Sequence, residues 1–538
     1  METSPYLSFR SSANLIVLEA GVVRSFPLEA LREWQIGRET PDNEKDVPFT
    51  SKIVSRNHGK IMNIDGEWYY SDLGSMNGTY YNGAKLTITS RGESDAVKLK
   101  NGDILRIDSE DLENPEERGV WMLFSTESIG NQWKTISLRK KETYFGRDTE
   151  SCDVVIPLSY VSARHMVIIK KNDSYYVMDC DSKAGTWVNN TAVHGEVLLK
   201  EKDMIAICDC MMIFTCNKII YNIPSQRKHT SKVAAAYEQI ANKPEIRTAE
   251  EKNEVSASVA NDNVLVEDNM PAQEHKPVVL KANIKSRKVP SNTGHGEKEL
   301  IRDVRVEVCE GTLVALLGGA GAGKSTVMNC MNGMETVGMT GTVEYKGVDL
   351  LKNFDRMKSL IGSVPQHEIF HEALTVEQEL THAAKHRLPG DTTKAEIKER
   401  VDSTLRQLGI EPIRKNRISK CSGGEKRRVN IGIELVADRQ LLCLDEPDAG
   451  LDPGNKRKLF ETLRSLAHDE GKSILTIIHD VSDIELFDKV IIMNKVNNVG
   501  RLAFAGTPKE AREHFGVDIK DVYQLMAKEP EKYVITEE

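Results

Sequence analysis

The chain has 538 residues, of which 39% are hydrophobic and 28% charged, and its formal net charge is −9. This length is too great for a single hydrophobic core and predicts several domains. The acidic balance gives no electrostatic reason to expect nucleic-acid binding. No run approaches the roughly 18 apolar residues of a membrane helix, and the first ten residues lack the apolar core of a signal peptide. We therefore expect a soluble, cytoplasmic protein.

Residues 8–222 contain short alternating strands separated by turns rich in Gly, Asn and Asp, which is typical of β-sandwiches. The pattern occurs twice, so it predicts two copies of one all-β fold, at residues 8–127 and 128–222. The matching positions are Gly37-Arg38 and Gly146-Arg147, Ser55-x-x-His58 and Ser162-x-x-His165, and Ser75-x-Asn77-Gly78-Thr79 and Ser182-x-Ala184-Gly185-Thr186.

The nine cysteines of the chain are scattered, and an odd number without a signal peptide indicates free thiols in a reducing compartment. Cys208, Cys210 and Cys216 are close enough in sequence to suggest a metal site. They lie in or beside an expected buried strand, at 205–214, and no second pair of ligands has zinc spacing. We expect them to be small apolar core residues.

Residues 223–276 are rich in Lys, Glu, Asn, Ala and Ser, with Tyr237 as the only aromatic residue. Such a segment buries too little apolar surface to offset its chain entropy, so we expect a flexible linker. The segment contains two threonines, Thr230 and Thr248, that a kinase could phosphorylate.

From residue 277 to 525, apolar strands alternate with helical segments, which predicts an α/β domain followed by a tail at 526–538. The expected strand Leu313–Leu317 leads directly into a glycine-rich loop and then a helix, the context of a P-loop. The loop residues expected to bind nucleotide are Gly318, Gly319, Ala320, Gly321, Ala322, Gly323, Lys324, Ser325 and Thr326.

Each part of this loop has a chemical reason. Its backbone N–H groups turn toward phosphate oxygens, and the following helix adds its positive end. Lys324 reaches the β- and γ-phosphates of ATP, and the Ser325 hydroxyl suits Mg²⁺. Downstream, the apolar run at 441–444 ends in two carboxylates: Asp445 suits Mg²⁺, and Glu446 suits polarising the attacking water. The sequence predicts an ATPase that uses Mg²⁺.

Further motifs in this half resemble those of ABC ATPases, within them the G subfamily of eye-pigment and sterol transporters. The resemblance covers about 240 residues. Its motifs, in family order, are the P-loop, the Q-loop at Gln366, the signature Ser422-Gly423-Gly424-Glu425, the Asp445-Glu446 pair, the D-loop to Asp452 and the switch residue His479. Glu425, where glutamine is usual, is the G-type variant.

The resemblance implies roles for these residues. Lys324, Gln366, Glu446 and His479 would be catalytic, and Gln366 would join Ser325 and Asp445 at the metal. It also implies a head-to-tail homodimer or heterodimer, in which Ser422, Gly423 and Gly424 of one domain close on the ATP held by the other. Two positions depart from the family: only His295 precedes the P-loop where an aromatic residue stacks on adenine, and Cys421 replaces an aliphatic residue.

The repeated motif of the N-terminal half resembles forkhead-associated (FHA) domains, which bind phosphothreonine peptides. The resemblance implies a phosphopeptide site in the first copy, where Arg38 offers a bidentate donor to phosphate. The implied site residues are Arg38, Ser55, Arg56, Asn77 and Thr79. His58 is expected to brace the loops. Thr230 or Thr248 of the linker, if phosphorylated, would be an internal ligand for Arg38, favoured by the short tether. In the second copy Ala163 and Ala184 replace Arg56 and Asn77, which predicts weak binding or a structural role.

Two functions remain open at this point. In the first, the chain is the ATPase subunit of a G-type ABC transporter, held at the membrane by a separately encoded permease and regulated by a phosphothreonine protein. G-type proteins usually carry a membrane domain after the ATPase, so a chain cut short of that domain is the other explanation. In the second, the chain is a soluble ABC ATPase that acts as a phosphopeptide-binding scaffold. A nucleic-acid-linked ABC machine is disfavoured, because neither a second ATPase half nor a long coiled coil is present.

Overall fold

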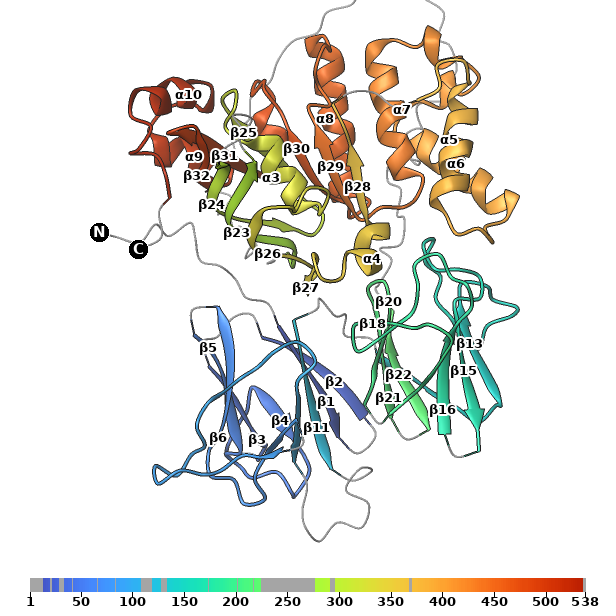
Figure 1. The fold of residues 1–538 in the computed structure, drawn as a ribbon, viewed down its shortest axis with the longest axis vertical. Helices are drawn as coiled ribbons and strands as arrows, with labels where there is room; N and C mark the ends of the chain where they lie inside the picture. Colours follow the sequence, from blue (N-terminus) through green and yellow to red (C-terminus); the bar gives the residue numbers. More distant parts are fainter. Residues whose placement is uncertain are drawn as a thin grey trace, which may run out of the picture.

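The computed structural model describes residues 13–535 apart from gaps at 20–21, 29–32, 41, 65, 83, 108–118, 127–132, 173, 201, 216, 224–275, 291–295 and 367–369. The predictions for the linker with Thr230 and Thr248, for Cys216 and for His295 lie outside the described residues. Two β-sandwiches lie side by side beneath a larger α/β domain (Figure 1). No helix among the described residues is long and apolar enough to cross a membrane.

The first sandwich packs a six-stranded sheet on a five-stranded sheet. Its core includes Trp34, Trp68 and Phe124, whose rings lie with centroids 5.2 and 6.0 Å apart in succession. The six-stranded sheet has the order β2 (Val22–Pro27), β1 (Asn14–Glu19), β11 (Val120–Ser125), β10 (Ile104–Ile107), β7 (Tyr80–Tyr81), β8 (Ala84–Lys85). The other has the order β4 (Val47–Phe49), β3 (Glu33–Arg38), β5 (Gly59–Ile64), β6 (Glu67–Asp72), β9 (Val97–Lys98).

The second sandwich repeats the five-stranded sheet and most of the six-stranded sheet of the first, as the internal repeat predicts. The six-stranded sheets differ at one edge, where the last and first strands of the second sandwich take the places of β1 and β2. Its six-stranded sheet has the order β12 (Trp133–Ser137), β22 (Lys218–Asn222), β21 (Cys210–Thr215), β20 (Met204–Ile207), β17 (Trp187–Val188), β18 (Thr191–Ala192). Its five-stranded sheet has the order β14 (Val154–Val155), β13 (Glu142–Gly146), β15 (Met166–Lys171), β16 (Ser174–Asp179), β19 (Glu196–Leu198).

The two sandwiches contact each other through the outer faces of their six-stranded sheets. An apolar cluster joins Ile16 and Leu123 of the first to Met211, Ile213 and Ile220 of the second. The burial of this apolar surface stabilises the contact between the two sandwiches.

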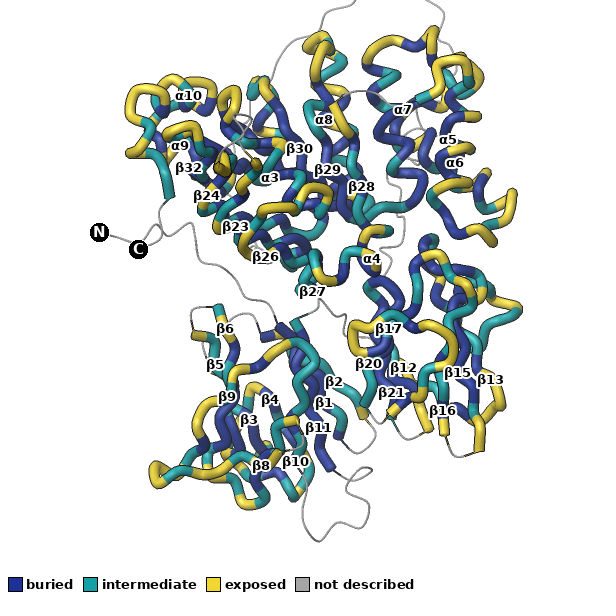
Figure 2. Tube along the Cα trace, in the orientation of Figure 1, coloured by how far each residue is buried: buried dark blue, intermediate teal, exposed yellow. Residues whose placement is uncertain are grey.

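The α/β domain is built on a ten-stranded sheet whose central strands are buried (Figure 2). The strand order is β27 (Val348–Asp349), β26 (Met339–Tyr345), β23 (Val278–Pro290), β24 (Glu297–Cys309), β32 (Val499–Gly506), β31 (Lys489–Val496), β25 (Leu313–Gly318), β30 (Ser473–Ile477), β29 (Leu441–Asp445), β28 (Ile361–Val364). Strands β25, β30, β29 and β28 are mutually parallel, so their carboxyl ends meet at one edge.

The helices divide into those that pack around the sheet and a separate helical subdomain. The first group is α3 (Lys324–Met331), α4 (Phe354–Met357), α8 (Pro453–His468), α9 (Pro508–Phe515) and α10 (Ile519–Lys528). The subdomain comprises α5 (Val376–Arg387), α6 (Lys394–Gln407) and α7 (Gly423–Leu435). Capping boxes at Thr375, Thr393 and Ser422 begin its three helices.

The predicted boundary between domain and tail at 525/526 is wrong. It falls inside α10, whose Met526 is buried in the core. Beyond the helix, the Tyr533 ring lies 5.6 Å from that of Phe515, and Ile535 N donates to Leu502 O over 2.9 Å. The chain through Ile535 therefore belongs to the α/β domain.

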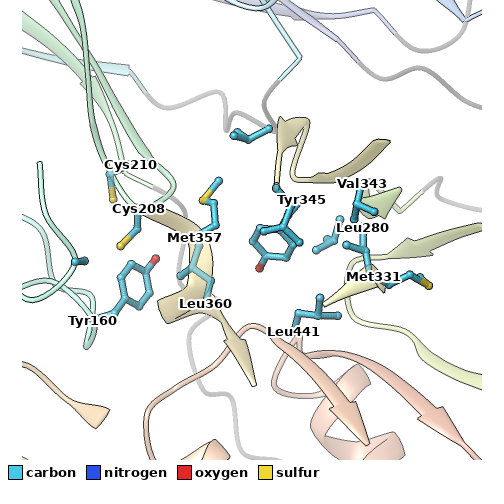
Figure 3. Close-up of a cluster of buried hydrophobic side chains, with 14 of the residues drawn as sticks. Tyr160, Cys208, Cys210, Leu280, Met331, Val343, Tyr345, Met357, Leu360 and Leu441 are labelled. Carbon is cyan, nitrogen blue, oxygen red and sulfur yellow. The ribbon is translucent and has the colours of Figure 1, made fainter. Parts of the chain in front are cut away.

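The second sandwich also packs against the α/β domain through a buried apolar cluster. Figure 3 shows Tyr160, Cys208 and Cys210 of the sandwich beside Met357 and Leu360. Cys208 and Cys210 are both fully buried, as expected of core residues.

A buried ion pair lies in the same interface. Lys346 Nζ and Asp209 Oδ2 are 2.6 Å apart, and Tyr160 donates to Asp209 Oδ1 over 2.7 Å. Burial alone raises the pKa of Asp209, but the Lys346 ammonium reverses the effect and the pKa lies below its usual value. The pair thus stays charged within the interface.

Candidate functional site: an ATP site at the carboxyl edge of the sheet

The glycine-rich loop joins β25 to α3 and requires backbone conformations that glycine adopts readily. Gly321 and Gly323 have φ angles of 73° and 83°, in the left-handed region. A Cβ at Gly323 would lie 2.6 Å from Ile301 Cγ2, so space excludes a side chain there as well. These constraints turn the loop back over the sheet edge and aim the N-terminus of α3 at its centre.

Lys324 is the first residue of α3 and is 8% exposed. Its Nζ donates to Gly318 O over 2.8 Å and to Gly319 O over 3.3 Å, which holds the ammonium group at the mouth of the loop. Burial lowers the pKa of Lys324, while the carboxylates of Glu446 and Asp445 oppose the shift. Ser325 and Thr326 follow in the first turn of α3, with Ser325 exposed.

Asp445 ends the buried strand β29 beside this loop. Its Oδ1 is buried without a hydrogen-bond partner. Burial raises the pKa of Asp445, and a hydrogen bond from Ser325 opposes the rise. An unsatisfied carboxylate oxygen next to a serine hydroxyl fits the oxygen ligands that Mg²⁺ prefers. Asp445 and Ser325 would hold the ion, and it would supply positive charge to neutralise the phosphate groups of ATP.

Glu446 is the point where separate elements converge. Its φ of 47° is unusual for a non-glycine residue and directs the side chain away from the strand. Gln366, after β28, donates from Nε2 to Glu446 Oε2 over 2.6 Å. His479, after β30, places Nε2 2.6 Å from Glu446 Oε1. The fold therefore brings Gln366, Glu446 and His479 together, as a catalytic constellation requires.

The signature segment lies on the helical subdomain. Ser422 is the N-cap of α7, and Glu425 accepts hydrogen bonds from the Ser422 backbone N–H over 2.7 Å and hydroxyl over 2.9 Å. Glu425 thus closes a capping box. None of the hydrogen bonds in the described part of the chain joins Ser422, Gly423 or Gly424 to the glycine-rich loop.

Three further residues of this region are placed by the structure. The sequence reasoning assigned no role to Arg427, yet its Nη1 donates to Gln366 O over 2.7 Å and ties α7 to the Q-loop. The basic residues that follow Glu425, at 426–428, were the feature of the sequence that could have indicated this contact. Asp452 is the N-cap of α8, and its side chain accepts from Asn455 N over 3.1 Å. Cys421 is buried in the apolar core of the helical subdomain.

The first sandwich gathers four of its five predicted phosphate-reading residues at one end, with Arg38 at the end of β3 and the other three on adjacent loops. Arg38 Nε donates to Val54 O over 3.2 Å. Ser55 Oγ accepts from the Met76 backbone over 3.0 Å, and the Asn77 amide donates to Ile53 O over 2.7 Å. Arg56 is exposed beside them. The contacts to backbone position the loops, and the guanidinium and hydroxyl groups form a polar surface suited to an anion.

Thr79 is the exception, and its predicted contact with ligand is wrong. Its side chain is 0% exposed, and its hydroxyl bonds to Asp72 over 2.6 Å and Tyr70 over 2.7 Å. His58 completes this buried network. Its Nδ1 accepts from Ser55 N over 3.1 Å, so Nε2 carries the proton and faces Thr79 at 3.2 Å. Both residues brace the loops from inside, as expected for His58.

The comparisons with known proteins agree with this organisation. Residues 301–449 match the family model described as "ABC transporter", and residues 34–108 and 143–208 match that of the "FHA domain". The ABC transporter ATP-binding/permease protein Rv1747 of Mycobacterium tuberculosis is 34% identical over 237 residues, which covers 44% of this chain and 27% of that protein. ABC transporter G family member 21 of Arabidopsis thaliana is 32% identical over 262 residues, covering 45% of this chain and 38% of that protein.

These alignments thus span 27% and 38% of the length of the two curated relatives. Among solved structures, cbiO1 from Clostridium perfringens, part of the ABC transporter complex cbiONQ, is 26% identical. The match covers 47% of this chain and 96% of that chain, with a TM-score of 0.39.

The fold and the site define the C-terminal half as an ATP-binding domain that hydrolyses ATP. It is an ABC-type ATPase domain with relatives among the G family of ABC transporters, and two FHA domains precede it.

Proposed function

We propose that this chain is the ATP-hydrolysing component of a G-type ABC transporter, that it uses Mg²⁺, and that its first FHA domain reads phosphothreonine. The observation that carries the proposal is the convergence of Gln366 and His479 on Glu446, next to Lys324 and Asp445. Glu446 polarises the attacking water, Gln366 senses the metal and the water, and His479 holds the γ-phosphate.

ATP closes a dimer in this proposal. The N-terminus of α7 at Ser422–Gly424 is a second anion site, and it lies on the helical subdomain rather than in the glycine-rich loop. A head-to-tail partner, either a second copy or a related chain, supplies this site to the ATP held by Lys324. The Ser422 hydroxyl, which now donates to the Glu425 carboxylate, would donate to a γ-phosphate oxygen instead. Hydrolysis then removes the contact and opens the pair.

The proposed partner in transport is a membrane permease. Binding to this permease would hold the chain at the surface of the membrane. The support is the kinship with transporters of the G family. The region between Gln366 and Cys421 contains α5 and α6 and offers the permease a rigid, charged helical surface. A change there reaches the ATP site through the Arg427 contact to Gln366.

Phosphothreonine recognition is assigned to the first FHA domain. Arg38, Ser55 and Asn77 lie on its loops, and Met76 between them is 92% exposed. The opposite end of this sandwich, at Gly66, Trp68 and Thr126, is the end that faces the ATPase domain. The recognition loops are therefore free to receive a phosphoprotein, which would recruit or regulate the ATPase.

The transport assignment is tested with the full chain and the polytopic membrane protein that copurifies with it from native membranes. When the two are joined in lipid vesicles, we expect the ATPase rate to change several-fold relative to the chain alone, and Lys324→Ala to abolish the change. An unaltered rate would reject coupling to a permease. It would favour the soluble scaffold, which predicts phosphoprotein partners and full ATPase activity without membranes.

A further inference from the structure

The recognition loops of the second FHA domain lie against the helical subdomain of the ATPase domain. These loops follow β13 and β16 and precede β15, and Figure 1 shows that end of the sandwich facing α4 and α6. The loops contact the turn that joins α5 to α6, at residues 388–393. The equivalent loops of the first FHA domain are at the end away from the ATPase domain.

Two carboxylates occupy the place where an FHA domain reads phosphate. Asp391 Oδ2 accepts a hydrogen bond from the backbone N–H of Ala163 over 2.6 Å. Its other oxygen lies 3.4 Å from Arg147 Nη2, and Arg147 Nη1 forms an ion pair with Glu396 on the first turn of α6. Arg147 corresponds to the phosphate-reading Arg38, and its Nε donates to Val161 O over 3.0 Å just as Arg38 donates to Val54 O.

The residues at which the second FHA domain differs from the first favour its contact with the α5–α6 turn. Alanine at 163, in place of Arg56 of the first copy, leaves the backbone N–H open to Asp391. Lys183 occupies the position of Met76, and its Nζ donates to His386 O over 2.5 Å and Leu388 O over 2.8 Å. These are carbonyls at the C-terminal end of α5, where a positive charge is favourable.

The second FHA domain also contacts the part of the ATPase domain that contains the ten-stranded sheet. Arg356 of α4 is 1% exposed, and its Nε donates to Cys208 O over 2.7 Å. Lys346, which follows β26, pairs with Asp209. Ser159 donates to Asp438, which lies between α7 and β29, over 3.0 Å. The second FHA domain therefore bridges the helical subdomain and the sheet.

We propose that the phosphate-reading face of the second FHA domain is an intramolecular docking site for the α5–α6 turn, with Asp391 and Glu396 in place of a phosphate group. While docked, this domain binds no phosphopeptide, and it restrains movement of the helical subdomain relative to the sheet. The dock is independent of the proposed transport function, because it requires neither nucleotide nor permease.

Amide hydrogen exchange of the full chain without nucleotide tests the dock. In Asp391→Lys/Glu396→Lys, the amides at 161–165 and 183–187 should exchange about tenfold faster or more, since charged hydrogen bonds that restrain these loops are lost. The matched control is Glu399→Lys, an exposed charge reversal on the same helix, and it should leave both segments unchanged. Equal exchange in the double variant and the control would overturn the proposal.

A charge swap separates docking from a folding defect. Arg147→Glu should release the same segments, and combining it with Asp391→Arg and Glu396→Arg should restore their protection. Arg38→Glu, at the equivalent position of the first FHA domain, should not affect them. Failure of the swap to restore protection, while ATP hydrolysis stays intact in every variant, would reject an electrostatic dock and leave the proposed function standing.

Discussion

Gln366 Nε2 donates a hydrogen bond to Glu446 Oε2 over 2.6 Å, although 80 positions separate the two residues in the chain. The contact forms because β28 and β29 are adjacent parallel strands whose carboxyl ends meet at one edge. Arg427 holds the backbone of Gln366 from α7. A movement of the helical subdomain would therefore reach the Glu446 carboxylate through Arg427 and Gln366.

Replacement of Lys324 by alanine should weaken ATP binding. The buried ammonium group lies at the mouth of the glycine-rich loop, and hydrogen bonds from a charged donor contribute enough to lower affinity by roughly 10- to 100-fold when lost. Titration with a fluorescent ATP analogue measures the effect. Lys458→Ala, at an exposed lysine of α8, is the control and should bind normally. Equal affinities in the two variants would remove Lys324 from the site.

Replacement of Arg38 by alanine should weaken the binding of phosphothreonine peptides to the full chain. In the proposed site the guanidinium donates two hydrogen bonds to the phosphate group, and its loss should reduce affinity by roughly 10- to 100-fold. Calorimetric titration with a phosphothreonine peptide library gives the affinity. Arg147→Ala is the matched variant in the second FHA domain, and we expect it to leave this binding unchanged. The reverse ranking would contradict the assignment of the site to the first copy.

The features that could be predicted from the sequence are those formed by residues close together in the chain. The glycine-rich loop, the Asp445-Glu446 pair and the two sandwiches depend on local spacing, and the structure contains each where the sequence predicts it. The direction of a single side chain is harder to predict. Thr79 belongs to a loop motif that is predicted to bind phosphate, yet its hydroxyl turns inward to Asp72 and Tyr70.

Contacts between domains could not be predicted at all. Arg147 and Asp391 are 244 positions apart, and Asp391 belongs to no motif. The end of the ATPase domain was also misplaced, because the packing of Tyr533 on Phe515 depends on tertiary structure rather than on any local pattern.

Acidification should destabilise the first FHA domain through His58. Burial lowers the pKa of His58 from 6.5 to about 4, although Asp72 and the Gly78 backbone favour its charged form. In the unfolded chain His58 is protonated below pH 6.5, whereas in the folded domain it stays neutral down to about pH 4. The free energy of unfolding should therefore fall by about 3 kcal/mol as the pH is lowered through this window.

Amide exchange in β5 and β6 of the full chain, measured from pH 7 to 4 and corrected for intrinsic rates, reports this change. His58→Gln keeps a neutral polar group and should have a flatter pH profile. A wild-type profile as flat as that of the variant would show that His58 is not the titrating group.

The buried pair of Asp209 and Lys346 should stabilise the interface of the second FHA domain. Asp209→Asn leaves the ammonium without its partner and should lower the free energy of unfolding by about 3–5 kcal/mol. The variant with both Asp209→Asn and Lys346→Met should be less destabilised than either single variant. Calorimetric melting of the two single variants and the double variant gives the change in the free energy of unfolding for each. If the change in the double variant equalled the sum of the changes in the single variants, the pair would not be coupled.

The pH dependence of this pair follows from the lowered pKa of Asp209. Its contribution is present above the ordinary pKa of 3.8, and it should be lost as the pH falls through the lower pKa of the folded state. In Asp209→Asn that acid-dependent loss should be absent.

Sedimentation of Glu446→Gln with Mg²⁺ and ATP tests the central claim most directly. The amide keeps the shape of the side chain but cannot polarise water, so turnover should fall by about 10²- to 10⁴-fold while ATP still binds. The trapped nucleotide should then hold two chains together between Lys324 and Ser422–Gly424, and removal of Mg²⁺ or Ser422→Glu should return the monomer. Full ATPase activity in this variant, or a monomer at saturating ATP, would contradict the account.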